Sequence, residues 1–210
     1  MADARRRLSV ALAPVLATAL ATGLLAGCGA SGTLTAGRQM TGSVLDPPFA
    51  VDGTALVDGD EAPFSLVDDT DRDLTLVFFG YIHCPDICGT VMSTMASAMT
   101  RLSEDERAAV DVVFVTTDPA RDTPEAVNDY ATSFDPDFIG ATGPIRTIIE
   151  VARPLGIAVE QGDKLPSGGY DVTHGTQIVA IDADDDGIAY WSEDVSSAQL
   201  AADLQHLLSE

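Results

Sequence analysis

Hydrophobic and polar positions form blocks along the chain, and each block has the length and spacing of a strand or a helix. Continuous apolar runs at residues 74–81 and 110–116, rich in β-branched and aromatic residues, predict strands buried on both faces of a sheet. Apolar residues at helical spacing follow at about 90–102. Capping signals at Thr123 and Ser196 open two further helices. Strands thus alternate with helices, which predicts an α/β fold.

The remaining elements are shorter. We expect a strand at 62–67, a helix from 123 to about 133, a brief strand at 138–141, a helix that begins at 143–144 and stops at Pro154, a hairpin formed by 176–182 and 188–191, and a closing helix at 196–208. A hairpin placed after alternating strands and helices predicts a central sheet of mixed direction, flanked by helices.

The first 27 residues have the pattern of an export signal. Three arginines at positions 5–7 precede an apolar, alanine-rich stretch at 8–25, and small residues stand directly before Cys28. This arrangement resembles the bacterial lipobox, in which the cysteine is lipidated and becomes the first residue of the mature chain. A plain transmembrane anchor is the alternative, because the apolar stretch is close to the ~18 residues that a membrane-spanning helix needs.

We therefore expect three segments: a signal peptide at 1–27, a lipidated Cys28 with a flexible tether up to 45, and one domain at 46–210. The tether is rich in glycine, serine, threonine and alanine, as flexible linkers are. The rest of the chain is long enough for a single well-buried core. The expected location is the extracytoplasmic face of a bacterial cell membrane, with the lipid as the anchor.

The chain is strongly acidic. Its 33 acidic residues against 11 basic ones give a formal net charge of −22, which argues against nucleic acid as a partner. Such acidity is typical of a solvated surface, and it could also gather cations near a binding site.

Cys84 and Cys88 lie where the strand at 74–81 meets the helix that follows. A helix N-terminus carries unpaired N–H groups and positive potential, so we expect it to favour the thiolate. Three residues separate the two cysteines, one more than in a redox C-x-x-C motif, so both sulfurs can converge on one metal ion. Soft thiolates select copper(I), with zinc and iron–sulfur as the other options, and a disulfide is also reachable. A purely structural disulfide is less favourable, because it would close a very small loop.

Three motifs resemble those of the Sco/SenC family. Residues 79–88, FGYIHCPDIC, resemble the family signature FGYTHCPDVCP; residues 118–125, DPARDTPE, are similar to its DPxRDTPE loop; and residues 170–174, YDVTH, are similar to its YxVxH segment. The resemblance covers about residues 62–208 and includes all three motifs in order. One departure is Gly89, where the family usually has proline; glycine loosens the first helical turn but removes no candidate ligand.

The resemblance implies a thioredoxin-like fold and one copper ion per chain, held by Cys84, Cys88 and His174. It also implies a role in cytochrome c oxidase assembly, in which the protein delivers copper to the dinuclear copper site of the oxidase or prepares the thiols of that site. The implied partners are the oxidase subunit that carries this site and an extracytoplasmic copper donor. The resemblance thus favours a metallochaperone, with thiol–disulfide oxidoreductase activity left open.

Two other functions use the same cysteines. A thiol–disulfide oxidoreductase would use Cys84 and Cys88 as its catalytic redox pair and would not need His174. Thioredoxin-type reductants have a cis-proline that faces the active pair, but here no proline directly precedes the strand at Thr176, and Pro166 is the nearest upstream. This favours the metal site. A peroxide-consuming or redox-sensing module is the third interpretation.

Several other residues could bind metal, but their context favours simpler roles. We expect His83 to point away from its neighbour Cys84, and His206 to face solvent from the last helix. Met92, Met95 and Met99 are spaced as the buried stripe of a helix.

Two acidic segments have both a structural and a functional interpretation. The segment with Asp118, Arg121 and Asp122 fits a turn that leads into a helix and contains an ion pair, or a loop that borders the copper site or the surface that binds a partner. Residues 182–193 match the EF-hand calcium loop, but strands flank them where an EF-hand has helices, so we expect an acidic hairpin turn, with weak calcium binding as the other interpretation.

Overall fold

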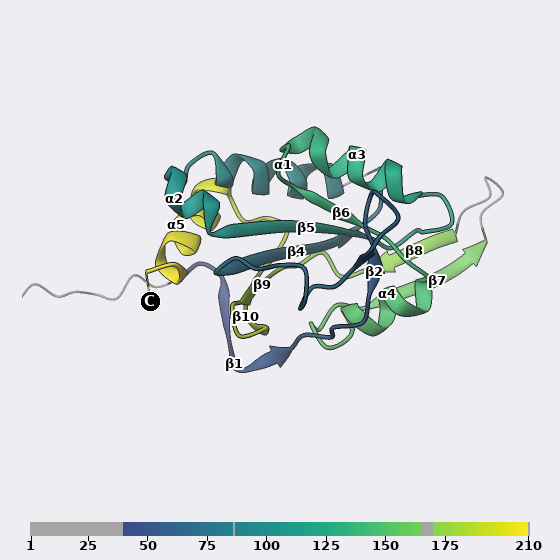
Figure 1. Ribbon diagram of the computed structural model, residues 1–210, viewed down its shortest axis with the longest axis horizontal. Coiled ribbons are helices and arrows are strands. Elements are labelled where there is room, and N and C mark those ends of the chain that lie inside the picture. The colour runs from purple at the N-terminus through teal and green to yellow at the C-terminus, as the bar shows by residue number, and fades with distance from the viewer. Residues whose placement is uncertain (1–39, 86, 165–169, 210) are drawn as a thin grey trace, which may run out of the picture. The chain divides into compact units, whose positions relative to one another are not determined.

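The computed structural model describes residues 40–209, except Asp86 and residues 165–169 (Figure 1). The predicted signal peptide, Cys28, the tether up to residue 39 and Pro166 lie outside the described residues. Among the described residues, no helix is both long enough and apolar enough to cross a membrane.

A six-stranded mixed sheet forms the centre of the fold. Its strand order is β1 (Ser43–Ala50), β10 (Asp186–Trp191), β9 (Ile178–Asp182), β4 (Leu74–Gly80), β5 (Val110–Thr116) and β6 (Ile139–Ala141). Strands β4, β5 and β6 are parallel, whereas β9 runs antiparallel to β4 and β10 antiparallel to β9. The predicted α/β class and mixed sheet are confirmed, and β5 has the bounds that its apolar run predicts.

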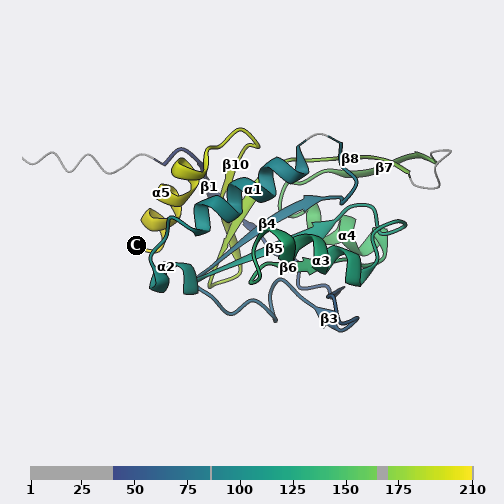
Figure 2. The ribbon, with the colours of Figure 1, turned by 90° about the horizontal axis from the view of Figure 1, so that it is seen from above.

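Helices cover both faces of this sheet (Figures 1 and 2). The helices α1 (Cys88–Met99), α3 (Pro124–Phe134) and α5 (Ser197–Leu207) bury apolar side chains in one cluster with alternate residues of β4, among them Phe78. The helix α4 (Ile145–Ala152) packs in a second cluster, which contains Val77 and Phe79. The short helix α2 (Glu104–Ala108) precedes β5. Because successive residues of a strand point to opposite faces, β4 contributes to both clusters and is fully buried.

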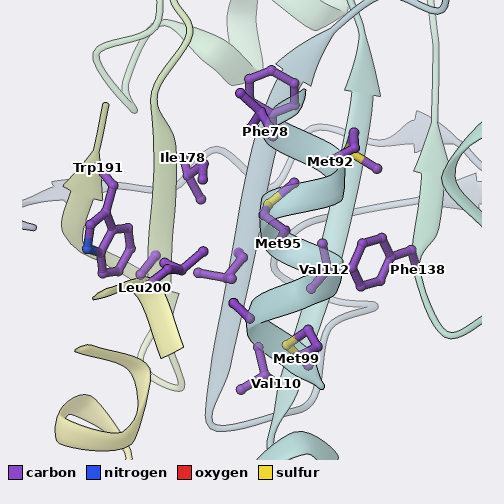
Figure 3. Close-up of a cluster of buried hydrophobic side chains, with 14 of the residues drawn as sticks. Phe78, Met92, Met95, Met99, Val110, Val112, Phe138, Ile178, Trp191 and Leu200 are labelled. Atoms are coloured by element: carbon purple, nitrogen blue, oxygen red, sulfur yellow. The ribbon is translucent and has the colours of Figure 1, made fainter. Parts of the chain in front are cut away.

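The methionine stripe of α1 belongs to the first cluster. Met92, Met95 and Met99 are buried between β4, β5 and the neighbouring helices (Figure 3). The prediction that these thioethers fill the core is confirmed.

The sequence did not predict β1, because this strand contains Pro47 and Pro48. Proline cannot donate a ladder hydrogen bond, but it is tolerated on an edge strand, and β1 is an edge strand whose one partner among the described residues is β10. The strand begins at Ser43, so the expected boundary between tether and domain, near residue 46, falls inside it.

A buried carboxylate holds the chain that leads into β1. Asp203 of α5 is 2% exposed, and its Oδ2 accepts hydrogen bonds at 2.9 Å from the backbone N–H groups of Thr41 and Gly42 and from Nε1 of Trp191. A Cβ on Gly42 would lie 2.4 Å from the Trp191 indole, so only glycine fits there. Residues 41 and 42 are therefore integral to the folded domain.

The expected strand at 62–67 is wrong in its extent. Only β2 (Leu56–Val57) and β3 (Pro63–Phe64) pair, and a turn follows. This turn is stabilised because the Asp69 carboxylate accepts a hydrogen bond from the N–H of Ser65, and the Thr70 hydroxyl donates to the carbonyl of Leu66. Side chains that bond to nearby backbone in this way compete with strand pairing.

A second hairpin, formed by β7 (Val159–Lys164) and β8 (Tyr170–His174), lies apart from the central sheet in both views (Figures 1 and 2). The strands pair so that His174, the last residue of β8, is opposite Val159, the first residue of β7. This hairpin was not predicted from the apolar pattern. It carries the candidate histidine ligand.

The acidic loop after β9 is a hairpin turn, as predicted. Oδ1 of Asp182 accepts hydrogen bonds from the N–H groups of Asp184 and Asp186, at 3.1 and 3.0 Å, and Asp185 adopts a left-handed conformation with φ of 62°. Glu193, the last acid of the EF-hand pattern, accepts a hydrogen bond from Thr176. The flanking elements are strands, so the segment is not a helix–loop–helix unit.

Candidate metal centre

The two cysteines lie where β4 meets α1. Strand β4 ends at Gly80, the loop 81–87 contains Cys84, and Cys88 is the first residue of α1. A Cβ on Gly80 would lie 2.9 Å from the Phe114 ring and 3.1 Å from the Cys88 sulfur, so glycine allows the helix to start this close to the strand. Cys88 is buried and Cys84 half-buried, and both cysteines are reduced.

His174, the last residue of β8, lies close to this junction of β4 and α1. Its Nε2 lies 3.9 Å from Sγ of Cys88. Its Nδ1 lies 2.9 Å from the carbonyl oxygen of Gly175, and since a carbonyl can only accept, Nδ1 carries the proton. The lone pair of the neutral ring is therefore on Nε2, the atom nearer Cys88. The rings of Tyr81 and Phe78 contact the imidazole edge-on, with centroids 5.8 and 6.5 Å away.

The separation of Cys88 and His174 suits one shared metal ion. Metal–thiolate and metal–imidazole bonds are about 2.3 and about 2.0 Å long in zinc sites, so one ion can contact two donors that lie up to about 4.3 Å apart. Cys84 makes a side-chain contact with Cys88, next to this pair. However, no three histidine, cysteine or acidic side chains of the described residues are already arranged as a complete metal site. The structure thus brings Cys88 and His174 to a bridging distance and places Cys84 in contact with Cys88.

The protonation states of the donors differ from the expectation. Burial, together with the contact from Cys84, raises the pKa of the Cys88 thiol to about 12. The prediction that the helix N-terminus favours the thiolate is therefore wrong for Cys88, because loss of solvation outweighs the helix potential. Burial also lowers the pKa of His174, against a smaller opposite effect of its hydrogen bond to Gly175, so the imidazole is neutral at pH 7.

Arg121 is linked to the imidazole of His174 through Tyr81. Arg121, in the loop between β5 and α3, forms an ion pair with buried Asp118. Its guanidinium carbon lies 5.9 Å from the centroid of the Tyr81 ring, and Tyr81 contacts His174. The predicted turn with an ion pair is confirmed, and this loop also borders the candidate site.

The family model described as SCO1/SenC matches residues 54–209, about three quarters of the chain. The chain belongs to the SCO1/SenC family. A protein from Arabidopsis thaliana named SCO1 homolog 1, mitochondrial, is 38% identical over 120 residues, which are 53% of this chain and 34% of the plant protein. The chain thus matches only about a third of that relative's length.

Solved structures of Sco proteins share the fold. The solution structure of apo Sco1 from Thermus thermophilus matches with a TM-score of 0.74 and 30% identity, over 82% of this chain and 99% of that one. The structure of Bradyrhizobium japonicum ScoI with copper bound matches with a TM-score of 0.65 and 26% identity, over 75% and 99% of the two chains. The predicted thioredoxin-like Sco architecture is confirmed.

The other histidines of this Sco-family chain lie elsewhere. The side chain of His83 is 66% exposed, and its Nδ1 lies 3.7 Å from Oδ1 of Asp122. His206 lies in the last turn of α5. The sequence did not reveal that Phe78 and Tyr81 flank the imidazole of His174. Only the position of Tyr81 next to the cysteine motif offered a signal.

Proposed function

We propose that this chain is a copper metallochaperone that carries one copper ion through Cys84, Cys88 and His174. The observation that carries the proposal is the 3.9 Å separation between Cys88 Sγ and His174 Nε2, with the imidazole lone pair on the nearer nitrogen. Two thiolates and one imidazole suit copper(I) and also tolerate copper(II). The copper-bound Sco relative from Bradyrhizobium japonicum supports copper as the cargo.

Copper is the substrate in this function, and it must leave the site. Cys84 is half-buried, so an incoming thiol could reach the ion on this side and displace the ligands one at a time, while buried Cys88 and half-buried His174 hold the ion until the exchange is complete. The proposed acceptor is the subunit that carries the dinuclear copper site of cytochrome c oxidase, and the proposed source is an extracytoplasmic copper donor.

We also propose that lipid on Cys28 anchors the chain to the outer face of a bacterial cell membrane, after cleavage of a signal peptide at 1–27. An anchor would hold the domain near a membrane-embedded acceptor and raise its effective concentration. Globomycin, which blocks lipoprotein signal cleavage, should leave an uncleaved precursor. A precursor that is processed normally when Cys28 is replaced by serine would contradict this anchor.

Anaerobic copper(I) titration tests the copper site. The wild-type chain should bind one ion, and Cys84→Ala, Cys88→Ala and His174→Ala should each lose stoichiometric binding. His206→Ala is the matched control, because it removes an imidazole from α5 and leaves the candidate ligands in place. Undiminished affinity in His174→Ala would contradict the three-ligand site.

A second candidate function is thiol–disulfide exchange, favoured by the contact between the side chains of Cys84 and Cys88. In this reaction the two thiols would be oxidised to one disulfide while a partner disulfide is reduced to two thiols. Cys84, the more exposed thiol, would attack the partner first. Reductase activity after removal of copper that is equal in wild type and His174→Ala would favour this function.

A further inference from the structure

Asp122 is a buried carboxylate next to the loop that carries Cys84, and it is not a ligand in the proposed copper site. The side chain of Asp122 is 0% exposed. Its Oδ2 accepts hydrogen bonds from the hydroxyl of Thr116 at 2.6 Å and from the backbone N–H of Ile82 at 3.1 Å. Asp122 therefore connects the end of β5 to the loop 81–87, two residues before Cys84.

The other oxygen of this carboxylate lacks a partner. Oδ1 of Asp122 is buried, and no donor among the described residues lies within hydrogen-bonding distance of it. Buried carboxylate oxygens are rarely left without a donor, and such a group calls for an explanation. The side chain of His83 faces it, with Nδ1 3.7 Å from Oδ1, which is too long for a hydrogen bond.

A small movement of the loop would close this gap. A shift of about 0.8 Å brings an N–H···O pair from this distance to the usual 2.9 Å. His83 directly precedes Cys84, so the same movement would also relocate the Cys84 thiol. The same loop carries one of the three candidate ligands, because Cys84 contacts the Cys88 side chain next to the Cys88–His174 pair.

We propose that Asp122 is a positioning residue for the copper site, and that it fixes Cys84 in the copper-bound protein by accepting a hydrogen bond from Nδ1 of His83. This inference rests on the proposed copper-binding function. It assigns His83 a role as a donor to Asp122 rather than as a ligand. The hydrogen bonds from Thr116 and Ile82 keep the carboxylate in place, and the bond from His83 forms when copper is bound.

The test compares copper(I) affinities of the full chain and its variants, measured anaerobically by competition with a chromophoric chelator. Replacement of residues that orient metal ligands usually weakens affinity by about 10–100-fold, and we expect about tenfold for His83→Ala. His83→Gln should recover much of the loss, because its amide can donate to Asp122. Since His83 is mostly exposed, a purely structural role predicts no change in any of these values. His206→Ala is again the control.

A double-mutant cycle and X-ray absorption complete the test. In the Asp122→Asn variant, an amide nitrogen can take the place of the partnerless Oδ1, and this nitrogen cannot accept a hydrogen bond from His83. His83→Ala should therefore weaken copper binding no further in this variant. The copper-loaded wild type and His83→Ala should show the same single imidazole. Equal losses in both backgrounds, or fewer imidazole ligands in His83→Ala, would overturn the inference. Unchanged affinity in His83→Ala would also overturn it but leave the copper function intact, whereas a wild-type chain that binds no copper would refute both.

Discussion

The Nε2 atom of His174 lies 3.9 Å from the sulfur of Cys88, although His174 is 86 positions further along the chain. One donor begins α1 and the other ends β8, so only the folded domain brings them together. A ligand that binds the folded state alone stabilises that state. Copper binding and folding are therefore expected to be coupled in this protein.

We expect copper(I) to raise the Tm of the chain through His174. Free copper at 100 times its Kd should add about 2.7 kcal/mol to the free energy of unfolding. The measurement is anaerobic thermal denaturation with and without copper. In His174→Ala, copper(I) should raise the Tm much less than in the wild type. Each protein is compared with its own metal-free form. The same increase in both proteins would mean that copper stabilises the fold without the imidazole.

Copper affinity should fall as the pH is lowered, because copper must displace the proton of Cys88. The pKa of this thiol is raised to about 12, so the thiol is protonated throughout the neutral range. Each displaced proton should weaken the apparent affinity roughly tenfold per pH unit below that value. The lowered pKa of His174 means that its imidazole competes with protons only at acidic pH.

Calorimetric titration in buffers of different ionisation enthalpy measures directly how many protons are released when copper binds. At least one proton per copper should appear at pH 7. Affinity that is constant between pH 6 and 8 would show that the Cys88 thiol is not a ligand.

The first turn of α1 should tolerate a larger residue at position 89. A Cβ on Gly89 would meet only the Tyr130 hydroxyl, at 4.0 Å, so Gly89→Ala should raise the free energy of unfolding by about 0.5–1 kcal/mol. Gly80→Ala, at the crowded end of β4, is the comparison and should destabilise by about 1–3 kcal/mol, because its Cβ would lie 2.9 Å from Phe114. Urea unfolding of the metal-free variants gives both values. Destabilisation by Gly89→Ala would show that this backbone requires glycine.

The sequence predicted the elements whose hydrophobic pattern is continuous, and missed those that depend on their neighbours. The strand β5 is apolar throughout and was located with the correct bounds, because burial on both faces requires such a run. In contrast, β1 contains two prolines, and its strand conformation depends on antiparallel pairing with β10. The expected strand at 62–67 was shortened by side-chain hydrogen bonds that favour a turn.

The site could be predicted only in part. The corner with Cys84 and Cys88 followed from the strand-to-helix pattern, whereas spacing alone could not bring His174 to it, and the resemblance to the family suggested that pairing. The thiolate expectation failed because the sequence shows that Cys88 starts a helix but not how deeply it is buried. The partnerless oxygen of Asp122 is likewise a property of packing, and nothing in the sequence indicated it.

The Asp203 carboxylate has a consequence for where the chain can be shortened. Among the described residues, two of its three donors are backbone groups of Thr41 and Gly42, so removal of everything before Ser43 would leave the buried carboxyl group with the Trp191 indole as its one described donor. A soluble fragment intended for crystallisation or titration should therefore start before Thr41, even though the matched family region begins at residue 54. The native N-terminal limit of the stable unit is thus set by a residue of the C-terminal helix.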